Sequence, residues 1–121
     1  MVQKTLRGLL VTCIFLFSAT AFSQATEKVL ARWSDGWYVA TVIQKIGPNY
    51  KVIFDDGDQA TVPPVGIKPL NWKAGSRVEC NWKGLGIYYT GTITQINDIK
   101  IIMAYDDGDR EITVIGRCRT R

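Results

Sequence analysis

Apolar and polar residues alternate along much of this chain, which is typical of β-strands whose two faces have different surroundings. The alternation is clear from Lys28, where Val29, Ala31 and Trp33 share one face while Leu30 falls on the other with Lys28 and Arg32. Further strands are expected at 37–46, 50–54, 59–62 and 67–70, separated by turns rich in Gly, Asp, Asn and Pro. No helical periodicity interrupts these five short strands, so the pattern predicts a small antiparallel sheet bent into a barrel.

The same series of strands and turns occurs a second time. The turn Phe54-Asp55-Asp56-Gly57-Asp58 returns as Tyr105-Asp106-Asp107-Gly108-Asp109, and strands are expected again at 78–82, 89–96, 100–105, 110–114 and 117–120. The offset between the copies grows from 49 residues, Trp33 to Trp82, to 51 residues, Phe54 to Tyr105, so the second copy has a longer first loop at 83–86. We therefore expect two barrels, at 27–70 and 76–121.

The junction between the copies, residues 71–75, is too short for a flexible tether. We expect the barrels to pack against each other with Trp72 filling the contact. Trp37 and Tyr88 have the opposite parity to the other aromatic residues of their strands and are expected on an outer face or at an interface.

The N-terminal segment has the features of a secretory signal peptide. Lys4 and Arg7 precede an apolar run at 8–17, and small residues follow at 18–23. We expect cleavage near residues 21–25 and a secreted or periplasmic protein, with an uncleaved anchor as the less favoured alternative because the apolar run is short. Residues 1–23 are therefore excluded from the fold, and no membrane span is expected after cleavage.

The net charge and the cysteines indicate what kinds of surface and covalent bond the chain can form. The chain of 121 residues has a formal net charge of +4, and removing Lys4 and Arg7 lowers it to about +2. Three arginines gather near the end, Arg117, Arg119 and Arg121, and a solvated tail is the favoured interpretation. Cys80 and Cys118 remain after cleavage and are expected to form a disulfide in an oxidising compartment, with buried free thiols as the alternative.

The sequence contains no histidine, so it lacks the commonest general base and the commonest zinc ligand. No cofactor and no metal are expected, and the acidic turns lack the ligand spacing of a calcium loop. An enzyme is the least favoured class.

The segments Val29 to Val42 and Val52 to Asp58 resemble a Tudor domain, and the whole of residues 28–120 resembles a tandem Tudor protein. The resemblance implies an all-β fold of two five-stranded antiparallel SH3-like barrels. It also implies a non-catalytic module that binds cationic lysine or arginine side chains, with or without methyl groups, on a protein or peptide. The residues it assigns to an aromatic cage are Trp33, Tyr38, Phe54 and Asp56 in the first copy and Trp82, Tyr89, Tyr105 and Asp107 in the second.

The two cages depart from the family pattern at one position. Asp58 and Asp109 stand directly after the turn glycine, where many Tudor readers have an aromatic residue. The cages would therefore be more open and more negative, and they would prefer unmodified lysine, arginine or a polyamine to a methylated side chain.

Other interpretations stay open at this stage. The aromatic residues could cap the barrel cores, and Asp and Gly are the residues that tight turns require. Nucleic-acid binding through Arg117, Arg119, Arg121, Lys73, Arg77 and Lys83 is an alternative function, and a cell-envelope scaffold is another.

Overall fold

The computed structural model describes residues 27–121, so the predicted signal peptide lies outside the described residues. They form ten β-strands and three short 3-10 helices without an α-helix, and none of these helices is long and apolar enough to cross a membrane. The elements are β1 Lys28–Trp33, β2 Gly36–Ile46, β3 Asn49–Phe54, β4 Gln59–Val62, η1 Pro64–Gly66, β5 Ile67–Pro69, β6 Arg77–Asn81, η2 Trp82–Gly84, β7 Tyr88–Asn97, β8 Lys100–Tyr105, β9 Arg110–Val114, η3 Ile115–Arg117 and β10 Cys118–Thr120.

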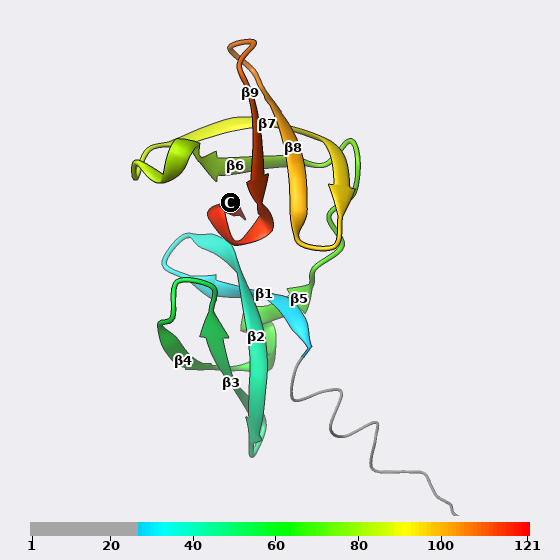
Figure 1. Ribbon diagram of the computed structural model, residues 1–121. Helices are drawn as coiled ribbons and strands as arrows, with labels where there is room; N and C mark the ends of the chain where they lie inside the picture. Colours follow the sequence, from blue (N-terminus) through cyan, green and yellow to red (C-terminus); the bar gives the residue numbers. More distant parts are fainter. Residues whose placement is uncertain (1–26) are drawn as a thin grey trace, which may run out of the picture.

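Both copies pair their strands in the same antiparallel order, which confirms the all-β fold class predicted from the alternation. In the first copy β1 pairs with β2 and β5, and β3 pairs with β2 and β4. In the second copy β6 pairs with β7 and β10, and β8 pairs with β7 and β9. Figure 1 shows the two barrels one above the other, with β6 to β9 above β1 to β5.

A β-bulge bends the long second strand of each barrel. The register shifts between Val42 and Gln44 in β2, and between Ile93 and Gln95 in β7, which is the equivalent position. A bulge adds one residue to one strand and increases its local twist, so a single strand can curve around a barrel.

The C-terminal strand β10 joins the two barrels into one ten-stranded sheet. Cys118 and Arg119 pair with Cys80 and Glu79 of β6, while Arg119 and Thr120 pair with Tyr38 and Trp37 of β2. In Figure 1 this red segment lies between the barrels. The expected solvated tail is therefore wrong: backbone hydrogen bonds on both sides hold this segment in place.

The buried side chains form two clusters that do not follow the boundary between the copies. The cluster of the first barrel contains Val29, Ala31, Ala40, Val42, Val52, Phe54 and Val62. The cluster of the second barrel contains not only its own residues but also Leu30 and Val39, which are each 2% exposed.

The central residues of β1 and β2 are consequently buried on both faces. Assigning Leu30 to a polar face was wrong, because that face is covered by the second barrel. Trp72 packs against the same cluster, as the short junction predicted, and so does Trp37, one of the two aromatic residues expected at an outer face or interface.

Cys80 and Cys118 form the predicted disulfide between directly paired residues of β6 and β10. Both cysteines are buried within the core of the second barrel. The bond therefore fastens the strand that joins the barrels.

The substitution Leu30→Ala tests the contact between the barrels. Leu30 lies in the first copy but fills the core of the second, so its truncation should lower the free energy of unfolding by about 2 to 5 kcal/mol. Urea titration followed by circular dichroism measures the change. Val65→Ala is the control, because Val65 is 86% exposed and its truncation should cost less than about 0.5 kcal/mol. Equal stability of the two variants would contradict the described interface.

Replacing both cysteines by serine should lower the free energy of unfolding by about 2 to 4 kcal/mol, because the disulfide closes a loop between residues 38 positions apart. The measurement is urea unfolding of the oxidised protein and of the double variant. If the protein purified under oxidising conditions shows two free thiols after denaturation, the bond is absent and the prediction fails.

Candidate ligand-binding sites

Each acidic turn is a hairpin fixed by its own aspartates. Gly57 and Gly108 have φ values of 97° and 95°, which glycine adopts without steric cost. A carboxylate oxygen of Asp56 accepts a hydrogen bond from the backbone N–H of Asp58 at 3.0 Å, and the equivalent bond in the second copy measures 2.9 Å. The turn chemistry thus accounts for one oxygen of Asp56.

The first aspartate of each turn forms an ion pair with a basic residue in the first strand of its own barrel. Lys28 lies 3.1 Å from Asp55, and Arg77 lies 2.7 Å from Asp106. The hydrogen bond from Arg77 is the main cause that holds the pKa of Asp106 below its usual value. These two aspartates are therefore already engaged. Both oxygens of Asp109 also accept a hydrogen bond, from Trp82 Nε1 and from the backbone N–H of Arg110, so an incoming cation would share them with these donors.

The predicted cage residues of the second copy converge on one small hollow of about 80 Å³, which we call the second site. It is lined by Trp82, Tyr89, Tyr105, Asp107 and Asp109. The ring of Tyr89 lies edge-on to those of Trp82 and Tyr105, with centroids 6.3 and 6.4 Å apart. Three aromatic rings and two carboxylates thus surround a space the size of one small cationic group.

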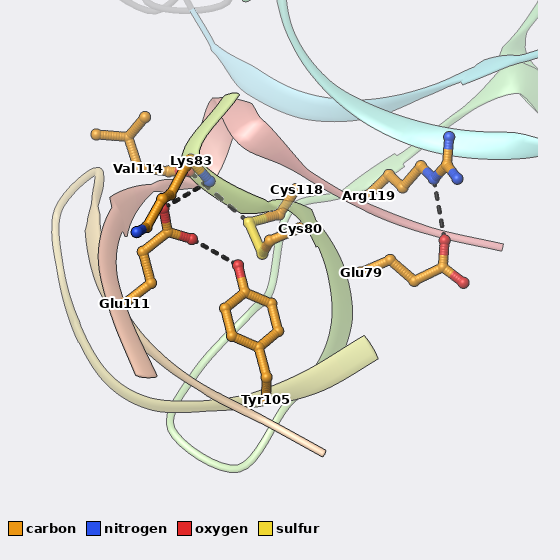
Figure 2. The surroundings of a disulfide bond; sticks show 8 residues. All are labelled: Glu79, Cys80, Lys83, Tyr105, Glu111, Val114, Cys118 and Arg119. Atoms are coloured by element: carbon orange, nitrogen blue, oxygen red, sulfur yellow. Dashed lines mark hydrogen bonds and ion pairs between the residues drawn. A yellow bond between two sulfur atoms is a disulfide. The ribbon is translucent and has the colours of Figure 1, made fainter. Parts of the chain in front are cut away.

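Hydrogen bonds fix two of these rings, one through Asp109 of the hollow itself and one through Glu111 outside it. Trp82 Nε1 donates to Asp109 at 3.0 Å, and the Tyr105 hydroxyl donates to Glu111 Oε1 at 2.6 Å. The other oxygen of Glu111 accepts the backbone N–H of Lys83 at 2.9 Å. Figure 2 shows Glu111 between Tyr105 and Lys83, beside the disulfide.

Glu111 was not among the residues predicted from the sequence. The only available signal was a difference between the copies, because Ala60 stands at the equivalent position of the first repeat. Burial is the main cause that raises the pKa of Tyr105 above its ordinary value, followed by the hydrogen bond to Glu111. Tyr105 is therefore held as a neutral phenol.

The predicted residues of the first copy also converge, but on a much larger hollow of about 850 Å³ that both barrels line. We call it the inter-barrel hollow. The first barrel contributes Trp33, Tyr38, Phe54, Asp56 and Asp58, which we call the first site. The second barrel contributes the opposite wall, which includes Asn81, Tyr88, Val114, Gly116, Arg117 and Arg119.

Arg119 crosses from β10 to the first site. Its guanidinium donates to the Tyr38 hydroxyl at 2.7 Å and to Glu79 at 3.0 Å. It also lies over the ring of Tyr88, 3.7 Å from the centroid. Tyr88 was expected on an outer face or at an interface, and it lies at this contact between the barrels. The alternation could not place Arg119 here, because its position depends on that contact.

The sites combine buried and exposed aromatic residues. Phe54 and Tyr105 are 8% and 4% exposed, so they belong to the cores, whereas Trp33 and Tyr89 are 58% and 42% exposed. Core capping is therefore the correct description of one ring in each copy. The exposed rings contribute less to the cores, because much of their surface stays in contact with solvent.

The basic residues proposed for nucleic-acid binding are largely engaged within the protein. Arg77 pairs with Asp106, Arg119 with Glu79, and Arg121 with both Asp35 and Glu79. The Lys83 ammonium lies 4.7 Å from the centroid of the Trp82 ring. These contacts break up the continuous basic surface that phosphate binding requires.

The described part of the chain contains no group of three or more acidic or cysteine side chains arranged to hold a metal ion.

Comparisons with known proteins agree with the fold. No protein-family model and no curated protein matches the chain. The structure is similar to the crystal structure of Crb2 tandem tudor domains, with a TM-score of 0.59 and 23% identity over 78% of this chain and 77% of that chain. A looser match is the crystal structure of ADCP1 tandem Agenet domain 3-4, with a TM-score of 0.37 and 12% identity over 85% of this chain and 84% of that chain. Another is the crystal structure of Arabidopsis thaliana AGDP1 AGD34, with a TM-score of 0.36 and 10% identity over 85% of this chain and 86% of that chain. The expected tandem Tudor fold is thereby confirmed.

The raised pKa of Tyr105 predicts an alkaline loss of stability. Above pH 10 the unfolded chain releases this proton while the folded chain keeps it, so the free energy of unfolding falls as pH rises. Tyr105→Phe should reduce the fall by up to about 1.4 kcal/mol per pH unit. Urea unfolding at pH 9 and pH 11 measures both slopes, and identical slopes would contradict the buried, hydrogen-bonded phenol.

Proposed function

We propose that this protein is a non-catalytic binding module whose first and second sites hold cationic side chains of a peptide or protein. The observation that carries the proposal is that duplicated aromatic and acidic residues line the inter-barrel hollow and the second site. Core filling explains Phe54 and Tyr105 but leaves the exposed Trp33 and Tyr89 without a structural task.

The chemistry of these sites suits a cation. An ammonium or guanidinium group is attracted to the electron-rich faces of aromatic rings, and methyl groups make it larger and less strongly hydrated. A nearby carboxylate adds Coulomb attraction and accepts hydrogen bonds from any N–H that methylation leaves. Asp58 and Asp109 supply a second carboxylate in each site, which favours side chains that keep such N–H groups, including unmodified lysine, arginine and their lower methylation states.

The two sites differ in what they can hold. The second site, at about 80 Å³, accommodates the end of one side chain. The inter-barrel hollow, at about 850 Å³, falls within the range of pockets that enclose whole small ligands, so it has room for a side chain together with part of its peptide. We therefore assign the principal binding role to the first site.

We further propose that the protein works outside the cytoplasm, secreted or in the periplasm. The buried disulfide supports this location because such bonds persist in oxidising compartments, and the signal-like N-terminal sequence supports it independently. The natural ligand would then be a secreted or cell-envelope protein with exposed lysine or arginine residues.

Trp33→Ala should weaken the binding of basic peptides at least tenfold, because it removes an exposed wall of the first site. Isothermal titration with lysine and arginine peptides, unmodified and with one to three methyl groups on lysine, measures the affinity. Tyr89→Ala should remove binding at the second site only.

Ile112→Ala serves as the control for these variants. Ile112 is 75% exposed and lies outside both sites, so its truncation should leave both affinities unchanged. Urea unfolding should show that Trp33→Ala changes stability by less than about 1 kcal/mol. Absence of binding by the wild-type protein to every peptide, or equal binding by Trp33→Ala, would overturn the proposed function.

A further inference from the structure

From the two charged walls of the inter-barrel hollow we infer that Arg117 binds an acidic group of the same peptide whose basic side chain enters the first site. This inference rests on the proposed function and adds a specificity-determining residue to it. The preferred ligand would be a segment in which a lysine or arginine has an aspartate or glutamate a few positions away.

The hollow has walls of opposite charge. Asp56 and Asp58 of the first barrel lie on one side, and Arg117 of the second barrel lies on the other. Within residues 27–121, Arg117 and Asp58 share this hollow but form no ion pair with each other. Neither side chain therefore neutralises the other by direct contact, and both border the hollow.

The two arginines of this wall have different roles. The guanidinium of Arg119 is bonded to Tyr38 and Glu79 and stacked on Tyr88, and the side chain is only 16% exposed. Arg119 therefore builds the wall. Arg117 is exposed, and no hydrogen-bond acceptor or carboxylate within residues 27–121 engages its guanidinium. An exposed guanidinium in this setting can form a bidentate contact with a carboxylate.

The longer loop of the second copy positions Arg117. A Cβ atom added at Gly84 would lie 3.3 Å from both Cζ and one terminal nitrogen of Arg117, so the guanidinium rests directly against the glycine backbone. Gly84 belongs to the loop at 83–86 that the first copy lacks. The extra residues thus help to position Arg117 at the inter-barrel hollow, which the repeat pattern alone did not predict.

A ligand with both charges uses both walls. The cationic side chain contacts Trp33, Tyr38 and the turn aspartates, and the carboxylate reaches Arg117 across the hollow. A purely basic peptide would bring a second positive charge to Arg117 and be disfavoured there. This distinguishes the hollow from a surface that attracts cations in general.

The test compares peptides that share one lysine and differ in the flanking residue, placed one to four positions away on either side. Isothermal titration should show that at least one aspartate peptide binds about fivefold more tightly than its asparagine counterpart at low salt. Arg117→Gln should abolish this preference, so that the aspartate and asparagine peptides bind with equal affinity. Arg117→Glu should reverse it in favour of a flanking lysine.

Arg110→Gln is the matched control, since it removes the same charge from the same barrel outside the hollow and should retain the preference. Lysine peptides that all bind equally well, or a preference that survives in Arg117→Gln, would overturn the role of Arg117 and leave the proposed function standing. A wild-type protein that binds none of the peptides would overturn both.

Discussion

The pairing of β10 with both β2 and β6 is the contact on which the rest of the structure depends. Only three residues long, this strand places Arg119 against Tyr38 and Cys118 against Cys80. The preceding helix η3 also brings Gly116 so close to the turn of the first barrel that a Cβ atom there would overlap the Asp55 side chain. Without these contacts the first site would be an open aromatic surface, because its second wall comes from the other barrel.

Much of the fold could be predicted from the chain because it depends on local patterns. Alternation located the strands, turn residues located the reversals, and the repeat of Phe54 to Asp58 at Tyr105 to Asp109 revealed the duplication. The contact between the copies could not be predicted in this way. Leu30 shares a strand face with Lys28 and Arg32 and looks like an exception on a polar face, but the second barrel covers it.

The candidate sites were only partly accessible for the same reason. Each set of aromatic and acidic residues lies within one barrel, so the sequence order was enough to bring it together. The wall opposite the first site comes from the second barrel and includes Tyr88, Arg117 and Arg119. The periodicity of a sequence does not predict which residues of two barrels meet. The two sites consequently differ in size although the same sequence pattern forms both. The second site is lined by its own barrel alone and is held by Glu111, whereas the first site has a second wall that comes from the other barrel.

The sharing of β10 also determines how far apart the two walls of the inter-barrel hollow lie. Both walls are hydrogen-bonded to the same strand and packed on a common core, so no flexible linker separates them. In the proposed complex, the distance between the acidic turn and the arginine wall would be fixed. The charged groups of the ligand would therefore need a matching spacing. Such preorganisation reduces the entropy that is lost on binding, and it disfavours ligands whose groups are spaced differently.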